Sequence, residues 1–439
     1  MTTIANLAGD LPAPPGPRLE HDLGSTDESI EWMSRWFREF GDTYRVYSPD
    51  RRSWTWVIHH PDDVRRVLVT NHGNYTKGVG LDRVKLLLGN GIMTSEGELW
   101  RRQRRMMQPA FHRKVVEQFA VEIRRLNDEM LAGWSAAADR GEPINLTESM
   151  SALTLTVVLH AIFSTDLAKL VRNLHDNPFM VVTRESKRDP KFAYQFRQLG
   201  RHVLELARER RRTESRPFDF MQMLMDAADP DSGATMTEHG LMDEILTLVV
   251  AGHETTASVL NWTWWLLSRH PAVEARVLDE QVRVPQDGIT TYADLQQLPY
   301  TTQVLEESMR LYPPGWLLSR RTIGPDRLGG YDVPPHTDVF LSPYVIHRDP
   351  RFWERPDSFH PDHFAAERVE RRHKYAYFPF AVGPRHCIGE NFSLFEMMLH
   401  LNGALRRFRL REVQPGPVAI EARINLRTAR DLYMRVEKR

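Results

Sequence analysis

Cysteine is nearly absent from this chain: Cys387 is the only one among 439 residues. A single cysteine cannot form an internal disulfide, which excludes the class of small folds held together by disulfides. It also argues against a structural zinc site, because such sites usually gather several sulfur ligands from closely spaced cysteines. A chain of this length can bury a large hydrophobic core, so its stability needs neither device.

Net charge is absent too, because 58 Lys and Arg residues are balanced by 58 Asp and Glu residues. This balance leaves no global electric field that would attract nucleic acid or an anionic membrane. The most apolar helix-length windows, 153–163 and 245–251, fall short of the roughly 20 residues that a bilayer crossing needs. Residues 1–25 contain no basic segment followed by an apolar stretch, as a signal peptide would. We expect a cytoplasmic protein with no membrane anchor and no nucleic-acid partner.

No internal repeat and no low-complexity linker divides the chain, and the proline-rich residues 12–17 predict an extended lead-in over 1–25. One large domain over 26–439 is therefore expected. Helical periodicity dominates this domain, and shorter alternating segments predict strands of small sheets. Helices are expected over 95–111, 113–134, 146–163, 192–212, 236–269, 292–312 and 388–408, and strands over 43–59, 327–333, 339–342 and 432–436. The predicted fold class is mainly α with small β-sheets.

Cys387 lies in a segment whose composition suits a bulky planar ligand: Phe380-Ala381-Val382-Gly383-Pro384-Arg385-His386-Cys387-Ile388-Gly389. Gly383 and Gly389 flank the sulfur, and a missing side chain lets the backbone turn sharply and approach a flat macrocycle. Arg385 adds a cation that can bind a carboxylate. An isolated cysteine is most often a small buried hydrophobe, but one thiolate acting alone can also ligate haem iron. With these flanking residues, the segment predicts a haem site with Cys387 as the iron ligand.

The segment resembles the haem-binding loop of the cytochrome P450 family, Phe-x-x-Gly-x-Arg-x-Cys-x-Gly, at every fixed position. The resemblance covers nearly the whole chain, from about Trp54 to the end. It implies the cytochrome P450 fold, in which haem b lies between a long distal helix and the cysteine-containing proximal loop. It also implies one catalytic domain over 26–439 with no fused reductase, and it places Phe380 among the residues that bind the cofactor.

A second motif, Ala251-Gly252-His253-Glu254-Thr255-Thr256-Ala257, lies in the middle of the expected long helix. Glycine inside a helix costs about 1 kcal/mol against alanine, so Gly252 needs a reason. By resemblance this is the distal helix, where Ala251 and Gly252 leave room for dioxygen. Glu254 and Thr255 match the family's acid and alcohol, which deliver protons for cleavage of the O–O bond. A threonine hydroxyl there is expected to bond the helix backbone and widen the helix locally. An ordinary buried helix with a tolerated glycine is the competing interpretation.

A third motif, Glu307-Ser308-Met309-Arg310, places an acid and a base three residues apart on one helical face. Such pairs are usually exposed and contribute little to stability. Here two prolines follow closely, and the combination resembles the family's Glu-x-x-Arg helix, whose ion pair is buried. The family adds an arginine as the third partner, and this chain has His363 at that position. Because histidine titrates near neutrality, we expect haem retention to depend on pH if His363 joins Glu307 and Arg310.

The resemblance also assigns residues to the haem propionates. Trp100 and Arg104 have the spacing of the family's Trp-x-x-x-Arg and share a helix face. Arg320 and Arg385 fall where the family supplies further contacts, and a guanidinium can bond both oxygens of a carboxylate. Arg321 is adjacent to Arg320 and could replace it. Surface solvation is the ordinary interpretation of any one of these arginines.

Two basic segments, 101–114 and 371–374, lie by resemblance on the proximal side of the fold. Because no flavin or iron–sulfur domain is fused to the chain, we expect electrons from a separate small acidic protein, a ferredoxin or flavodoxin, steered by these charges. A solvated charged surface is the alternative interpretation. The basic residues concerned are Arg101, Arg102, Arg105, Arg113, Lys114, Arg371, Arg372 and Lys374.

The substrate pocket is expected to be apolar, which predicts a lipophilic small molecule. By resemblance its walls come from residues 75–92, 246–255, 314–318 and 424–428. The apolar side chains in these segments include Leu87, Leu88, Val250, Trp316, Leu317 and Leu426, although several of them could be ordinary core residues. A terpenoid, a fatty-acyl chain and a polyketide-like scaffold all fit such a pocket.

These motifs predict a soluble, bacterial-type haem-thiolate monooxygenase of secondary metabolism that uses O2 and two electrons. Two alternatives keep the haem: an enzyme driven directly by peroxide, and a sensor or carrier that binds ligand without turnover. The pair Glu254-Thr255 disfavours both, because neither needs protons delivered to reduced dioxygen. A cysteine hydrolase is disfavoured because no partner histidine is specified by the sequence.

Overall fold

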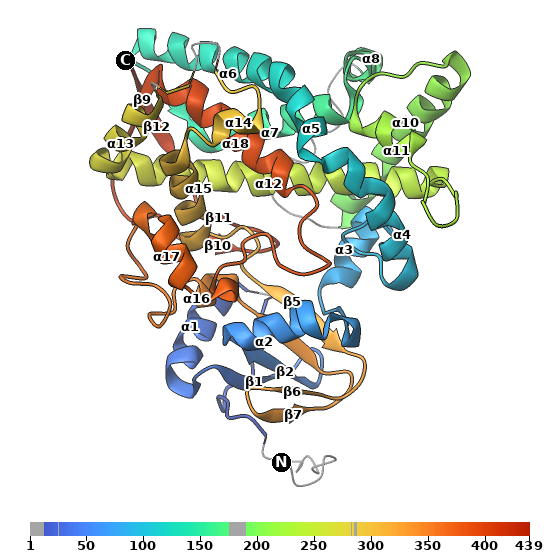
Figure 1. Ribbon diagram of the computed structural model, residues 1–439, viewed down its shortest axis with the longest axis vertical. Coiled ribbons are helices and arrows are strands. Elements are labelled where there is room, and N and C mark those ends of the chain that lie inside the picture. The colour runs from blue at the N-terminus through green and yellow to red at the C-terminus, as the bar shows by residue number, and fades with distance from the viewer. Residues whose placement is uncertain (1–12, 25, 175–189, 282, 285–287) are drawn as a thin grey trace. The chain divides into compact units, whose positions relative to one another are not determined.

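The computed structural model describes residues 13–24, 26–174, 190–281, 283–284 and 288–439. Its contacts divide the chain into two compact units, and each unit combines segments that are far apart in the sequence (Figure 1). The first unit consists of Met1–Val79, Met309–Cys387 and Ile420–Leu426. The second consists of Gly80–Ser308, Ile388–Ala419 and Arg427–Arg439. The predicted lead-in over 1–25 lies largely outside the described residues.

The first unit is built on a five-stranded sheet of order β1-β2-β8-β5-β3. β1 and β2 form an antiparallel hairpin, β8 runs parallel to β2, and β5 is antiparallel to both β8 and β3. The strands are β1 Thr43–Ser48, β2 Ser53–Ile58, β3 Tyr75–Lys77, β5 Leu318–Thr322 and β8 Asp338–Leu341. Apolar side chains of β2 and β8 alternate toward a buried core that also contains Val67, Leu68 and Phe378.

Short elements complete the first unit around this sheet. They are α1 Ser29–Phe40, α2 Pro61–Arg65, the π-helix η1 Arg66–Thr70, η2 His72–Asn74, the hairpin of β6 Asp326–Leu328 and β7 Tyr331–Val333, α16 Pro343–Ile346, η6 Pro361–Phe364, α17 Ala366–Arg371 and η7 Lys374–Ala376. A two-stranded ladder of β10 Ile420–Ala422 and β11 Leu426–Thr428 begins in this unit.

The second unit is helical, and its longest helix is α12, Glu238–Arg269. The Thr237 side chain caps the start of α12 by accepting a hydrogen bond from Gly240 N, which satisfies one of the free amides of the first turn. α7, Leu146–Phe163, packs along α12, and α18, Glu390–Leu405, packs against α6, Ala120–Arg140. In Figure 1 α12 crosses this unit from one side to the other.

The remaining elements of the second unit surround these four helices. They are α3 Leu81–Leu88, α4 Gly97–Met107, η3 Gln108–Phe111, α5 Arg113–Val116, η4 Glu117–Phe119, α8 Asp166–Leu174, α10 Pro190–Thr213, α11 Phe220–Asp226, α13 Pro271–Gln281, α14 Tyr292–Leu295, α15 Pro299–Leu311 and the sheet β4-β12-β9 of Pro143–Asn145, Tyr433–Lys438 and Phe408–Glu412. The last residues of α15 belong to the first unit.

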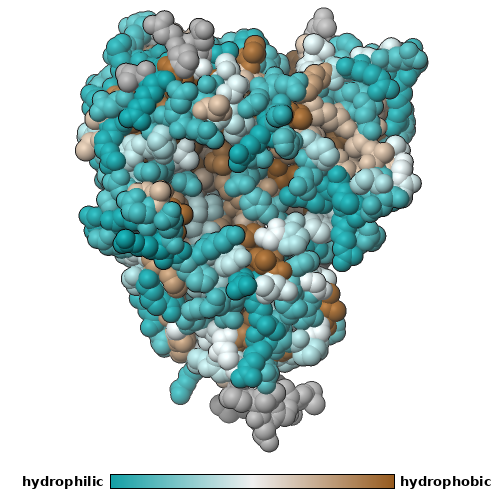
Figure 2. Space-filling model, in the orientation of Figure 1, coloured by the Kyte–Doolittle hydropathy of each residue, from teal (hydrophilic) through white to brown (hydrophobic). Residues whose placement is uncertain are grey.

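One helix of the described residues, α7, is long and apolar enough to cross a membrane by length and composition alone. However, 61% of its apolar window is buried inside the protein, and it packs between α6 and α12. Core helices of soluble proteins have the same character. Hydrophilic side chains prevail on the face drawn in Figure 2.

The predicted fold class is confirmed, and α7 has the predicted bounds. The segment 43–59 is a hairpin of two strands, and the predicted helix over 292–312 is two helices. Pro299 explains that break, since proline is favoured in the first helical turn and cannot donate the hydrogen bond of a helix interior. The predicted helix over 113–134 contains the 3-10 turn η4 and continues to Arg140. It ends there because Gly141 adopts a left-handed φ of 68° as a C-cap.

Candidate active site

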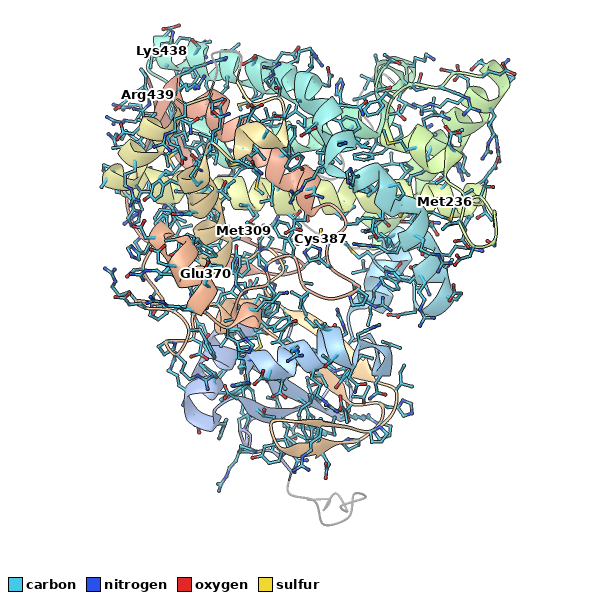
Figure 3. All side chains as sticks on the ribbon, in the orientation of Figure 1. Met236, Met309, Glu370, Cys387, Lys438 and Arg439 are labelled. Atoms are coloured by element: carbon cyan, nitrogen blue, oxygen red, sulfur yellow. The ribbon has the colours of Figure 1, made fainter. Side chains whose placement is uncertain are left out.

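Cys387 ends an irregular loop between α17 and α18 that belongs to the first unit, and its side chain is labelled in Figure 3. The residue is exposed and does not form a disulfide bond. Two backbone hydrogen bonds shape the loop: Cys387 N donates to Phe380 O at 2.9 Å, and His386 N donates to Gly383 O at 3.0 Å. Ala381 has a φ of +57°, which is costly for a residue with a side chain and marks a tightly constrained backbone.

Gly383 is required at its position for two independent reasons. Its φ is +79°, in the left-handed region that glycine adopts without strain. A Cβ at this position would lie 2.0 Å from the carbonyl oxygen of Leu68 on η1. The loop is therefore pressed against η1, and this contact fixes where the following residues lie.

The residues of this loop fit a haem. It offers one exposed thiol on a constrained backbone, with the half-buried Arg385 two residues before it. Among the described residues, no group of three or more His, Cys, Asp and Glu side chains is arranged to hold a metal ion. A single thiolate is a sufficient protein ligand for haem iron but not for a structural zinc ion.

The second signature lies on α12 in the second unit, and the helix is α-helical throughout the motif. The Thr255 hydroxyl donates a hydrogen bond of 2.7 Å to the carbonyl of Ala251, as the sequence predicts. The local widening of the helix that was predicted with it is wrong, because the α-helical pattern continues through the motif. A Cβ on Gly252 would meet Val158 Cγ2 of α7 at 2.8 Å. The structure therefore gives Gly252 a packing role that the sequence could not reveal, because it allows α7 and α12 to approach closely.

Glu254 and Thr255 are half-buried, whereas the neighbouring His253 and Thr256 are buried. His253 is tied to α7, since its Nε2 and the hydroxyl of Ser151 are 2.9 Å apart. The face of α12 that carries Glu254 and Thr255 thus differs from the face that packs on α7. Ala251 and Gly252 are partly exposed as well, whereas His253 and Thr256 are buried.

The arginines assigned to the propionates have different surroundings. Arg321 makes a bidentate pair with the buried Asp338, at 2.8 and 2.9 Å. Arg320 is half-buried, and successive residues of a strand point to opposite faces of the sheet. Trp100 is buried on α4 with the half-buried Arg104 one turn later. Arg320 also has a protein partner, since it donates a hydrogen bond of 2.8 Å to the carbonyl of Ser319, and its assignment to a propionate stays a prediction.

Arg310 is fully buried and holds a single stretch of backbone. Its guanidinium donates to the carbonyls of His347, Pro356 and Ser358 at 2.6 to 3.0 Å. His363 is also buried, and its Nε2 donates to the carbonyl of Glu354 in the same stretch. Glu307 is fully buried one turn before Arg310 on α15. Burial and the Arg310 charge hold the pKa of His347 well below its usual value, so His347 is neutral.

The expected pocket residues are not equally accessible. Leu88, Trp316 and Leu426 are buried, whereas Leu87, Val250 and Leu317 are partly exposed. The Trp316 indole N–H donates to the carbonyl of Arg423, and Leu426 N donates to the carbonyl of Pro314. Trp316 is thus fixed against the β10–β11 turn, which is one of the segments expected to form the pocket.

The predicted docking surface is only partly free for a partner. Arg105 is paired with Asp229 and Arg101 with Glu98. Arg372 lies 3.9 Å from the ring of Trp353 and donates to the carbonyl of His363. Exposed basic side chains remain at Arg113 and Lys114 on α5, and at Arg371 and Lys374 near η7.

Sequence reasoning missed the residues that hold the loop 89–92. The carboxylates of Asp243 and Glu244, on α12, accept hydrogen bonds from two backbone amides of this loop. The glycines at 89 and 91 were the available signal, since closely spaced glycines outside regular structure often mark a close approach of two chain segments.

Comparison with known proteins agrees with this arrangement. The Cytochrome P450 family model matches residues 14–428. Cyclooctatin synthase of Streptomyces melanosporofaciens is 36% identical over 374 residues, which cover 81% of this chain and 80% of the relative. Cyclooctat-9-en-7-ol 5-monooxygenase of the same organism is 32% identical, with 91% of this chain and 89% of the relative covered. The solved cytochrome P450DA heme domain, at 22% identity and a TM-score of 0.86 over 98% of both chains, has the same fold. The chain therefore belongs to the cytochrome P450 family, and it is a monooxygenase of lipophilic small molecules that carries haem b on a cysteine thiolate.

Proposed function

We propose that this protein inserts one oxygen atom of O2 into a carbon–hydrogen bond of a carbocyclic substrate of the terpenoid class, with electrons from a separate ferredoxin or flavodoxin in the cytoplasm. The observation that carries the proposal is the proximal loop, where the chain's only thiol is exposed at the end of a constrained backbone. When bound, the haem supplies the activation of O2 and the transfer of oxygen.

The cofactor would be held by residues of this chain. Cys387 provides the thiolate for the iron, and Gly383, Gly389 and Phe380 shape the loop that carries it. Arg104, Arg320 and Arg385 bind the propionates together with the indole N–H of Trp100. Arginine suits this task because its planar guanidinium bonds both carboxylate oxygens at once.

Arg310 and His363 would position the loop rather than touch the cofactor. Both bind backbone carbonyls of the stretch 347–358 and thereby organise the polypeptide that precedes the proximal loop. Glu307, buried on the same helix as Arg310, completes the proposed network. Removing one member of a buried charged network typically costs several kcal/mol, so this network would matter for haem retention.

Proton delivery is assigned to Glu254 and Thr255, beside Ala251 and Gly252. The Thr255 hydroxyl donates to Ala251 O, so its lone pairs remain able to accept a proton from water or from a neighbouring acid. Glu254 is half-buried and can exchange protons with solvent. The two side chains thus provide a relay whose last oxygen is Thr255 Oγ1.

The substrate class rests on the relatives and on the predicted pocket. One relative is named for cyclooctat-9-en-7-ol, which by its name is an unsaturated ring alcohol. The side chains Leu87, Leu88, Val250, Trp316, Leu317 and Leu426 are apolar and would bury such a hydrocarbon skeleton.

Electrons would enter near the proximal loop through the remaining exposed basic residues. Arg113 and Lys114 lie on α5, which packs against α18, the helix that follows Cys387. Their charge would steer an acidic donor, and its association should slow with rising ionic strength.

The test is a ligation experiment on Cys387→Ser. The parent protein, reduced and treated with carbon monoxide, should show the long-wavelength Soret band of a thiolate ligand, and the variant should lose this band together with oxygenation of a terpenoid alcohol. Ser393→Ala, on α18 six residues later, is the matched control and should keep both. A variant without any cysteine that retained the band would refute the proposed ligation.

A further inference from the structure

The loop that follows α3, residues 89–92, is held against α12 by hydrogen bonds to two adjacent carboxylates. Asp243 Oδ2 accepts a hydrogen bond of 2.8 Å from Asn90 N, and Glu244 Oε2 accepts one of 2.9 Å from Ile92 N. Asp243 is 3% exposed and Glu244 is fully buried. Hydrogen bonds from backbone amides to buried carboxylates are charge-assisted and stronger than those between neutral groups.

The backbone of the loop is shaped to receive these side chains. A Cβ on Gly89 would lie 2.2 Å from Asp243 Oδ1, and a Cβ on Gly91 would lie 2.1 Å from Thr247 Oγ1. Gly89 has a φ of +64° and ends α3. The loop can approach α12 this closely only because both positions lack a side chain.

A third element joins at the same point. Arg197 on α10 forms an ion pair of 2.7 Å with Asp243 Oδ1, so the two oxygens of one carboxylate hold two different segments. One turn later, a Cβ on Gly200 would lie 2.4 Å from the sulfur of Met242 on α12. α10 is therefore held against α12 by close packing and by a charge that also binds the loop.

We propose that Asp243 and Glu244 are positioning residues that fix the loop 89–92 on α12 and thereby set the size of the ligand that the active site accepts. The inference rests on the proposed function, which places Leu87 and Leu88 of α3 in the substrate pocket. These leucines immediately precede the loop 89–92. Asp243, which holds this loop, lies eight residues before Ala251 on α12, or about 12 Å along the helix. Because α3 ends at Gly89, a loop released from α12 would let both leucines move away from the helix.

Asp243→Asn tests these hydrogen bonds with almost no change of volume. An amide has one acceptor oxygen and a donor nitrogen, so it cannot accept from both Arg197 and Asn90 N, as the carboxylate does. We expect hydrogen exchange in the peptide covering 89–92, measured by mass spectrometry, to become about tenfold faster. Glu244→Gln keeps an acceptor for Ile92 N and should have a smaller effect.

The second measurement uses two haem ligands of different size on the ferric protein. In Asp243→Asn, the dissociation constant of 4-phenylimidazole relative to that of imidazole should change by about fivefold or more, because the wall beside the bulky ligand is no longer fixed. Imidazole alone should bind as in the parent. Arg197→Gln leaves the Asp243 carboxylate bound to Asn90 N, so it should change the ratio of the two dissociation constants less, in the same direction. It is the replacement test if Asp243→Asn does not fold.

Arg208→Gln is the matched control. Arg208 also joins α10 to α12, through Glu238, but this pair is exposed and does not touch the loop, so exchange and ligand selectivity should stay unchanged. Unchanged exchange in Asp243→Asn would show that Asp243 does not hold the loop. Faster exchange with an unchanged ratio of dissociation constants would show that the loop does not set ligand size. A parent protein that binds neither imidazole would instead contradict the haem site, and the exchange result would still stand by itself.

Discussion

Glu396 is a buried acid that the proposed chemistry does not use. It lies on α18, nine residues after Cys387, and it is 1% exposed. Among the described residues, neither of its carboxyl oxygens has a hydrogen-bond partner. Burial without such a partner favours the neutral form and raises its pKa well above the usual value of 4.5. Burial therefore disfavours the charged form of Glu396 in the folded protein.

Glu396→Gln should change how stability depends on pH. Above pH 4.5 the Glu396 carboxyl loses its proton in the unfolded chain but keeps it in the folded protein. The free energy of unfolding therefore falls as pH rises, by about 1.4 kcal/mol per pH unit until the raised pKa is reached. The glutamine removes this slope, so the variant should gain stability relative to the parent as pH rises from 4.5 toward the raised pKa. Urea unfolding across that range measures it. Glu367→Gln, at an exposed site on α17, is the control, and parallel curves for parent and Glu396→Gln would show that Glu396 is ionised in the fold.

Gly383→Ala tests the glycine of the proximal loop, where the structure leaves no room for a side chain. Its Cβ would meet the carbonyl oxygen of Leu68 at 2.0 Å, so the loop backbone has to move. Gly41→Ala is the matched control, because Gly41 has a similar φ of +82° and no heavy atom within 4 Å of the added carbon. The control should lose only the strain of a side chain at the backbone conformation of Gly41, φ 82° and ψ −152°, which costs about 1 to 3 kcal/mol. Gly383→Ala should lose more stability and much of its haem, read from the ratio of Soret to protein absorbance, and equal haem content in the two variants would contradict this role.

At the scale of the elements, periodicity predicted the long helices well because the apolar spacing that predicts a helix lies within the helix's own segment. α7 was predicted to the residue, and α12 to within two residues at its start. The break before α15 was missed, although Pro299 was visible, because apolar spacing continues on both sides of it. The five-stranded sheet could not be derived, since β8 joins β2 from more than 270 residues away and no local pattern specifies that pairing.

The residues of the candidate site also differ in how far the sequence could predict them. Cys387, Thr255 and Arg310 could be proposed from the sequence because each belongs to a short motif. The engagement of Arg321 by Asp338 and of Arg372 by Trp353 was not foreseeable, because each depends on a partner brought near by the fold. The packing role of Gly252 was hidden for the same reason: its neighbour, Val158, is on another helix.

Thr255→Ala tests the proposed role of the middle of α12 in proton delivery. The hydroxyl bonds the backbone at Ala251 O, and its loss removes the last oxygen of the proposed relay while the helix keeps its own ladder. We expect normal haem content and ligand binding, but product formed per reduced nicotinamide consumed should drop roughly tenfold or more, with peroxide released instead. Thr256→Ala removes the adjacent buried hydroxyl and should stay coupled. The opposite ranking of these two variants would assign the proton route to Thr256.

At the scale of the whole molecule, three buried histidines among the described residues, His59, His347 and His400, have lowered pKa values, which oppose their protonation in acid. Burial lowers the pKa of His59 and of His400 to about 3, and that of His347 well below its usual value of 6.5. His400 is held as a neutral ring by two partners, since its Nε2 accepts from the indole N–H of Trp264 and its Nδ1 donates to Asn127 Oδ1. His59 and His347 lie in the first unit and His400 in the second, so acid acts on both units.

The free energy of unfolding should therefore fall as pH drops below 6.5, because these histidines bind protons in the unfolded chain but not in the folded protein. Each histidine contributes about 1.4 kcal/mol per pH unit down to its folded pKa, which for His59 and His400 is about 3. His400→Gln can still offer an acceptor to Trp264 and a donor to Asn127 but has no proton to gain, so its urea-unfolding free energy should decline less steeply between pH 6.5 and 4 than that of the parent. His239→Gln, at an exposed site on α12, should decline as the parent does. If His400→Gln has the parent's slope, His400 titrates in the folded state, and the acid limit lies with other groups.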